Sequence, residues 1–289
     1  MSGTPPFADR GIGETAVVET APDAVVDLFG LLTRLGDPVT LFLVVVAGYL
    51  LADHLGVPAE RMATALALAL GAFALTLALK HAFALPRPPG AATDGYGFPS
   101  GHALGATVVY GGLAALFDRR RVRIAAAALI VVVAASRVVI GVHYLVDVVA
   151  GVGVGVAYLA TALRAGPGWP PERVTAVDAR RVFTLAVGVG LLALAVAVVR
   201  DTVVATAAAA GGWIGWTVAA DRVGRVRGST RHLVASLLVL PGVAAVVGTV
   251  VDGGVSLPVA AALGGGVVAL LLVLPGLTAV AKKRAADPA

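Results

Sequence analysis

The chain has 289 residues, of which 58% are hydrophobic and 13% charged, with a mean hydropathy of +0.93 and a net charge of +5. Soluble domains carry about a quarter charged residues, so this composition excludes an ordinary soluble enzyme and indicates a polytopic membrane protein. The absence of cysteine excludes disulfides and thiolate metal sites. The basic residues lie in short loops between apolar segments, which is explained by membrane topology rather than by nucleic-acid binding.

The first half of the chain divides into a polar tail, one short amphipathic segment and five apolar spans. Residues 1–22 are polar, and residues 23–35 repeat apolar side chains at helical spacing. Because a spanning helix needs about 20 residues, we expect 23–35 to be an interfacial helix. The predicted spans are 38–52, 62–79, 101–117, 124–142 and 144–163, with a polar, Pro/Gly-rich segment at 81–100.

The second half begins after a proline-rich linker. Residues 165–181 contain three prolines and Trp169, and four further spans follow near 182–199, 202–220, 233–251 and 256–281. The predicted units are therefore a core at 23–164, a cytoplasmic linker at 165–181, a four-helix region of unassigned role at 182–281 and a basic tail at 282–289. The expected fold is an all-α, polytopic transmembrane helical bundle with nine spans plus the interfacial helix.

The distribution of basic residues predicts the orientation of this bundle. Cytoplasmic loops carry an excess of Lys and Arg, and with the loop at 119–123 inside, 16 of the 22 basic residues lie on the cytoplasmic side and 6 on the other. This places the N-terminus outside and the C-terminus in the cytoplasm. The segment 81–100, His102 and His143 then share the extracytoplasmic face of the cell membrane.

Three side chains in the apolar run from 125 to 163 can carry a charge: Arg137, His143 and Asp147. An ionisable group at membrane depth costs about 2.5–3.5 kcal/mol on insertion scales, so a functional site is indicated. His143 and Asp147 are four residues apart, which puts them on one face of a helix. A carboxylate that accepts a proton from one imidazole nitrogen leaves the other as a nucleophile. Nearby cations lower the tendency of the histidine to protonate and Asp147 opposes them, and the sequence does not decide between these effects.

Two further clusters fall on the same predicted face. Lys80 and Arg87 begin the polar segment, and Ser100 and Gly101 open the third span. Arginine fits phosphate oxygens bidentately and lysine adds a point charge. Ser100 stands where a helix N-cap belongs, and Gly101 lets an anion approach the backbone N–H groups of the helix start. Together with Arg137 they predict an oxyanion cradle rather than a metal site, and no cofactor is expected.

These clusters carry a family resemblance. The motifs are Lys80-x6-Arg87-Pro88, Pro99-Ser100-Gly101-His102 and Ser136-Arg137-x5-His143-x3-Asp147. They resemble the complete pattern of the type 2 phosphatidic acid phosphatase family, which shares its site with vanadium haloperoxidases. The resemblance covers roughly residues 23–163 and extends to the interfacial helix and five spans of the family's membrane members.

The resemblance implies roles for each residue. His143 is the nucleophile that forms a phosphohistidine, Asp147 orients it, and His102 is the general acid that later activates water. No metal takes part. The residues expected to bind the phosphoryl group and stabilise its transition-state charge are Lys80, Arg87, Ser100, Gly101 and Arg137.

The resulting hypothesis is a membrane phosphatase acting on a lipid phosphate or diphosphate at the outer leaflet. Candidate substrates are an isoprenoid diphosphate, phosphatidic acid or a phosphatidylglycerol-type phosphate, and the fold does not choose between them. One alternative is a transporter or scaffold that retains a phosphatase-like site, because the family core does not need the spans at 182–281. Another is a phosphotransferase with an acceptor other than water.

The glycine run 151–155 and the pair Gly211 and Gly215 lie inside predicted spans. No strand precedes the run, so a nucleotide-binding loop is not indicated. We expect these glycines to allow close helix packing.

Overall fold

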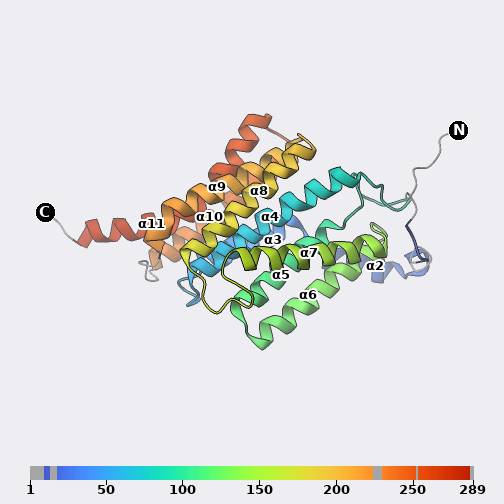
Figure 1. Ribbon diagram of the computed structural model, residues 1–289, viewed down its shortest axis with the longest axis horizontal. Helices are drawn as coiled ribbons and strands as arrows, with labels where there is room; N and C mark the ends of the chain where they lie inside the picture. The colour runs from blue at the N-terminus through green and yellow to red at the C-terminus, as the bar shows by residue number, and fades with distance from the viewer. Residues whose placement is uncertain (1–9, 14–17, 224–229, 252, 287–289) are drawn as a thin grey trace.

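The computed structural model describes residues 10–13, 18–223, 230–251 and 253–286, and their regular elements are all helical (Figure 1). The all-α prediction is therefore confirmed for this part of the chain. Part of the predicted tail at 1–22 lies outside the described residues. Residues 224–229 and the end of the basic tail, 287–289, also lie outside them. The elements are α2 (Asp23–Leu32), η1 (Thr33–Gly36), α3 (Pro38–Leu50), α4 (Ala59–Phe83), α5 (Gly101–Phe117), α6 (Arg120–Val139), α7 (Leu145–Ala165), α8 (Ala176–Val196), α9 (Arg200–Val223), α10 (Thr230–Val251) and α11 (Leu257–Ala286).

The number of membrane crossings is lower than nine when each helix is judged by length and composition. Six described helices are long and apolar enough: α4, α6, α7, α8, α9 and the Leu257–Pro275 part of α11. The pair formed by Asp23–Gly36 and Pro38–Leu50, bent by 48°, would be a seventh. The span predicted at 101–117 corresponds to the 17-residue helix Gly101–Phe117, and α10, at the span predicted for 233–251, has a shorter apolar stretch at Leu238–Val250. The nine-span count is therefore not confirmed.

The shortness of α5 has a packing reason. It lies against α4, α6 and α7, and most of its side chains are buried (Figure 1). A helix enclosed by longer neighbours does not itself have to match the thickness of the hydrocarbon layer, because its ends are covered by protein.

Glycines bring the helices of both halves close together, as expected. A Cβ on Gly151 would lie 2.6 Å from the Ser100 carbonyl oxygen at the start of α5, and one on Gly155 would lie 2.9 Å from Thr107. A Cβ on Gly211 would come within 2.0 Å of a carbonyl oxygen of α11. The packing prediction is thus confirmed for these three positions, whereas Gly153 meets nothing within 4 Å.

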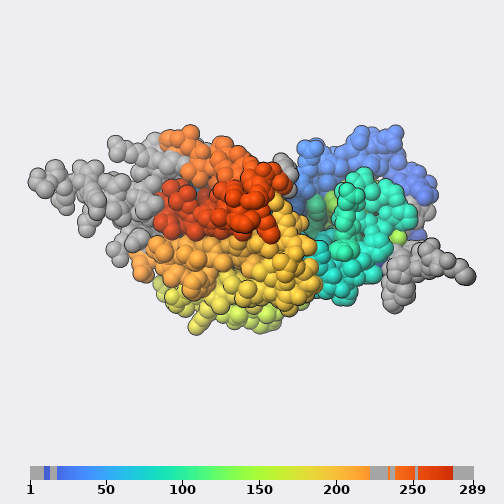
Figure 2. Space-filling model, turned by 90° about the horizontal axis from the view of Figure 1, so that it is seen from above, coloured from blue at the N-terminus to red at the C-terminus, as the bar shows by residue number. Residues whose placement is uncertain are grey.

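The C-terminal helices α8–α11 pack against α4 and α3 of the first half. Tyr49 on α3 donates a hydrogen bond to the Leu272 carbonyl of α11 at 2.8 Å, and Phe183 on α8 contacts the position of Gly212 on α9. α8 begins at Ala176, inside the stretch predicted as linker, and α11 continues through residue 286. In Figure 2 these helices occupy one end of the visible face, and α2, α3 and the 81–100 segment occupy the other.

Candidate active site

Four helix ends meet on one side of the molecule. The carboxyl ends of α4 and α6 lie beside the amino ends of α5 and α7, because successive helices run in opposite directions (Figure 1). Two hydrogen bonds join the three motifs directly: the Ser100 N–H donates to the Asp147 carbonyl at 2.9 Å, and Arg87 Nη1 donates to the Val142 carbonyl at 3.0 Å. Motifs separated by up to 67 residues in sequence are thus brought together.

His143 lies in the turn between α6 and α7, not on a helix. Gly141 provides the positive φ of 70° that this turn requires, and the N–H groups of Val142 and His143 both donate to the Arg137 carbonyl at 3.2 Å. Because α7 begins at Leu145, the expectation of two residues on one helical face is wrong for His143.

Asp147 reaches the histidine because it caps the start of α7. It lies in the first turn, where a carboxylate is favoured by the helix dipole, and its Oδ2 accepts the Tyr144 N–H at 3.1 Å. The same Oδ2 is 3.5 Å from Nδ1 of His143. The carboxylate thus adopts the orienting position through a capping contact.

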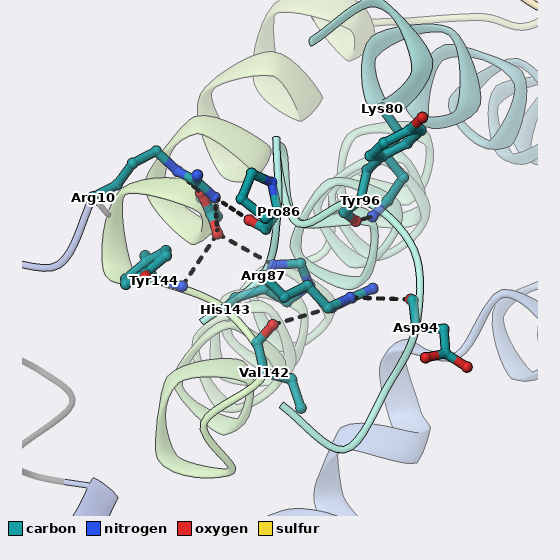
Figure 3. A network of polar contacts seen from close by, with 10 residues as sticks. Arg10, Lys80, Pro86, Arg87, Asp94, Tyr96, Val142, His143 and Tyr144 are labelled. Atoms are coloured by element: carbon teal, nitrogen blue, oxygen red, sulfur yellow. Dashed lines mark hydrogen bonds and ion pairs between the residues drawn. The ribbon is translucent and has the colours of Figure 1, made fainter. Parts of the chain in front are cut away.

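The contacts of His143 determine its tautomer (Figure 3). Its Nε2 lies 3.1 Å from Nη1 of Arg87. A guanidinium group can only donate, so Nε2 accepts and the imidazole proton resides on Nδ1, facing Asp147. Nε2 is therefore the nitrogen with the free-base lone pair, as a nucleophile requires.

The charge state of His143 follows from its surroundings. Burial lowers the pKa of His143 to about 4, and the cations Arg87, Arg137 and Lys80 act in the same direction, while the contact with Asp147 raises it. The balance left open by the sequence is therefore decided in favour of the neutral form. At neutral pH the imidazole can act as a nucleophile without first losing a proton.

Arg10 contacts Asp147 from the N-terminal tail, and the sequence analysis missed it. Its Nε lies 3.0 Å from Asp147 Oδ1, and its Nη2 lies 3.2 Å from Oδ2 and 2.9 Å from the Pro86 carbonyl (Figure 3). Its guanidinium also stacks 4.9 Å from the centre of the Tyr144 ring. An isolated arginine in a polar tail carries no spacing signal, so only the three-dimensional structure reveals this contact.

Lys80 and Arg87 hold the connection between α4 and α5 across the site. Lys80 Nζ donates to the Tyr96 carbonyl, and Arg87 Nε donates to the Asp94 carbonyl at 3.1 Å (Figure 3). Both cations bond to neutral backbone oxygens, and an incoming phosphate oxygen is a stronger acceptor for either of them.

The start of α5 supplies one hydroxyl and one packing glycine. Ser100 occupies the N-cap position as predicted, but its side chain makes no capping bond, and its buried Oγ has no partner among the described residues. A Cβ on Gly101 would lie 2.8 Å from Thr76 Cγ2 and 3.6 Å from Lys80 Cε. Glycine is thus needed at position 101 for the close contact with α4. The sequence had suggested another reason, the approach of an anion to the backbone.

Arg137 and His102 are each paired with a residue from the break between α2 and α3. Arg137 is 5% exposed, and its Nη1 donates to Thr33 Oγ1 at 2.6 Å. His102 Nε2 lies 2.7 Å from Asp37 Oδ1. Neither Thr33 nor Asp37 was singled out from the sequence, because both lie outside the motifs.

Because the chain has no cysteine, the metal ligands to consider are histidine and carboxylate side chains. Within the part of the chain that the structure describes, no three such side chains are grouped so that they could hold a metal ion.

Comparison with known families agrees with this geometry. Residues 61–170 match the model of the PAP2 superfamily. This segment of the chain is similar to the PAP2 superfamily. No curated protein and no solved structure matches it. The resemblance found in the three motifs is therefore confirmed. A PAP2 match indicates phosphatase activity on phosphate esters, and the long apolar helices indicate a membrane protein.

The PAP2 match contains all eight residues predicted for the site, from Lys80 to Asp147. The three partners found only in the structure, Arg10, Thr33 and Asp37, lie before it. The PAP2 segment thus supplies the motif residues, and the chain's own N-terminal elements supply contacts that hold three of them.

Proposed function

We propose that this PAP2 protein hydrolyses a lipid phosphate or diphosphate through a phosphohistidine on His143, without a metal ion. The observation that carries the proposal is the arrangement around His143 Nε2, which is 3.1 Å from Arg87 and oriented as an acceptor. A neutral imidazole with its lone pair directed at a cationic group is ready for an anionic electrophile.

The first step follows from these positions. The phosphoryl group displaces the Arg87–His143 contact, so that Arg87 binds its oxygens while Nε2 attacks phosphorus. Arg137, whose buried Nε has no partner among the described residues, and the Ser100 hydroxyl can donate to the remaining oxygens. Lys80 adds a third positive charge. Together these donors would stabilise the charge that develops in the transition state.

Electrostatic support for the nucleophile comes from Asp147. As the Nε2–P bond forms, the imidazole becomes cationic, and the carboxylate beside Nδ1 stabilises it. The carboxylate keeps its position through Arg10 and the Tyr144 N–H. Attack of water on the phosphohistidine then releases phosphate and returns the electron pair to Nε2.

A lipid substrate is supported by exposed apolar side chains that are close in sequence to residues of the site. Phe83, Leu145 and Val146 are 52%, 38% and 41% exposed and lie within three residues of Lys80, His143 or Asp147. Acyl or isoprenoid chains can cover such side chains while the phosphate enters the polar end of the bundle.

Purified protein and a panel of lipid phosphates test the proposal. Phosphate release is expected to survive EDTA, to be inhibited by vanadate and to disappear in His143→Ala, whereas equal release from that variant contradicts it. Phosphatidic acid, a phosphatidylglycerol phosphate and an isoprenoid diphosphate should be compared. Adding a soluble alcohol as a second acceptor distinguishes hydrolysis from phosphotransfer, because a transferase would form the new phosphate ester instead of inorganic phosphate.

A further inference from the structure

The break between α2 and α3 is docked onto the active site. Asp23–Gly36 and Pro38–Leu50 bend by 48° at Asp37, and residues of η1 together with Asp37 contact α5 and α6. Thr33 accepts from Arg137 at 2.6 Å, the Leu35 carbonyl accepts from Tyr110 at 2.7 Å, and Asp37 contacts His102.

The backbone at the break is close to the site as well. A Cβ on Gly36 would lie 2.4 Å from Val133 Cγ1 and 3.3 Å from His102 Cδ2. Only glycine therefore allows the chain to pass this close to α6 while it brings the next residue, Asp37, to the imidazole.

Asp37 does not cap α3 with its side chain, although it occupies the N-cap position. It is the N-cap of α3, where an aspartate ordinarily accepts a hydrogen bond from the N–H of the second or third helical residue. Here its side chain makes no capping bond. Its Oδ1 instead lies 2.7 Å from Nε2 of His102, a distance typical of a charge-assisted hydrogen bond.

We propose that Asp37 is the positioning carboxylate of the general acid His102, so that this site contains a second His–Asp pair besides His143–Asp147. The proposal deepens the phosphatase function above and rests on it. An ionised carboxylate only accepts, so the contact places a proton on Nε2 of His102. Nδ1 is then the nitrogen that donates to the leaving group.

The surroundings of His102 explain why a carboxylate beside it is needed. Burial of the ring disfavours an imidazolium at His102 most strongly, and the cations Arg137 and Lys80, which face it, act in the same direction. A general acid must nevertheless carry its proton when the leaving group departs. Asp37 is the carboxylate that faces the ring, and it opposes these effects in part.

The proposed reaction has two steps. In the first, the His143 Nε2–P bond forms and the P–O bond to the alcohol breaks, while His102 Nδ1 transfers its proton to the departing oxygen. In the second, water attacks phosphorus and gives its proton to His102 Nδ1, the N–P bond breaks and phosphate leaves. Both histidines return to their starting protonation states, and no further reactant is needed.

A comparison of leaving groups tests the role of Asp37. Asp37→Asn is expected to reduce kcat on phosphatidic acid about 30-fold or more, within the range of general acid catalysis. The pre-steady-state burst of p-nitrophenolate from p-nitrophenyl phosphate should fall less than threefold, because this leaving group departs without a proton. Asp37→Glu should recover part of the lost kcat. Equal losses for both substrates, or no loss for either, would overturn the proposal.

Two controls separate this proposal from the phosphatase function itself. Asp118→Asn removes an exposed carboxylate that pairs with Arg123 at 2.7 Å on another helix end, and it should leave the activity on both substrates unchanged. If His143→Ala releases phosphate as fast as the native chain, the phosphatase mechanism fails whatever Asp37 does.

A spectroscopic measurement tests the pair without any activity. In 15N-histidine-labelled native protein, with the signal assigned by His102→Gln, neutral His102 should be the Nε2–H tautomer. In Asp37→Asn, whose amide can either donate or accept, both tautomers are expected. A native His102 in the Nδ1–H tautomer would overturn the assignment.

Discussion

Arg87 offers a direct test of the electrostatics at the nucleophile. The pKa of His143 is lowered to about 4 from its ordinary value of 6.5, mainly by burial and further by the three cations. This difference corresponds to roughly 3 kcal/mol in favour of the neutral imidazole. Arg87 is the first of the three cations that lower this pKa, and each pKa unit it contributes is worth ~1.4 kcal/mol. Arg87→Gln should therefore raise the pKa of His143.

The assay is the ratio of kcat/KM between Arg87→Gln and the native chain, measured from pH 7 to pH 4. The ionisation of the substrate is common to both proteins and cancels in this ratio. Near pH 4 about half of the native His143 is neutral, and less of it is neutral in the variant. The ratio should therefore fall between pH 7 and pH 4, by about fivefold for the first unit by which the pKa of His143 rises. This fall adds to a constant loss of activity from the missing phosphate ligand.

A matched control and a reversibility check complete the experiment. Arg123→Gln removes an exposed arginine that pairs with Asp118, and its ratio should stay flat. Activity after return to pH 7 shows that acid exposure has not unfolded the protein. A flat ratio for Arg87→Gln would refute the electrostatic account of His143.

Three further predictions concern the tail, the helix packing and the orientation. Arg10→Met removes two hydrogen bonds to the buried Asp147 carboxylate, each of a kind worth roughly 1.5–3 kcal/mol. In steady-state assays kcat should fall at least tenfold, with KM changed less than twofold. An unchanged kcat would contradict the role of Arg10 in holding Asp147. Gly211→Ala places a Cβ 2.0 Å from a backbone carbonyl oxygen of α11, so it should lower the free energy of unfolding by about 1–3 kcal/mol and the melting temperature in detergent by several degrees. Gly266→Ala, where a Cβ would meet nothing within 4 Å, should leave the melting temperature unchanged. Asp94→Cys, the sole cysteine of that variant, should react with an impermeant thiol reagent from outside intact cells, and reaction only after lysis would reverse the proposed orientation.

The helical architecture was predictable because apolar periodicity and length are local properties of the sequence. The start of α5 follows from such a signal, Ser100. The bounds of α4, Ala59–Phe83, extend beyond the predicted 62–79, and its end at the left-handed Ala84 has no signal in the sequence. The number of spans was less predictable. Whether a 17-residue helix such as α5 crosses a membrane depends on the neighbours that enclose it, and those are set by tertiary packing.

The motif residues of the site were predictable because their spacings match a known family, and the structure brings them together at one end of the bundle. The contacts that hold them were not. Asp147 reaches His143 through a turn and a helix cap, although the spacing of four suggested one helical face. Arg10 and Asp37 lie 137 and 65 residues from their partners, and no local pattern encodes contacts over such separations.

The phosphoenzyme intermediate is the most direct test of the central claim. Protein mixed with a 32P-labelled lipid phosphate and denatured in alkali within milliseconds should retain label that is stable to base and labile to acid, as phosphohistidine is. Peptide mapping should locate this label at His143, and His143→Ala should carry none. Label at another residue, or rapid phosphate release with no label on the protein, would contradict the account.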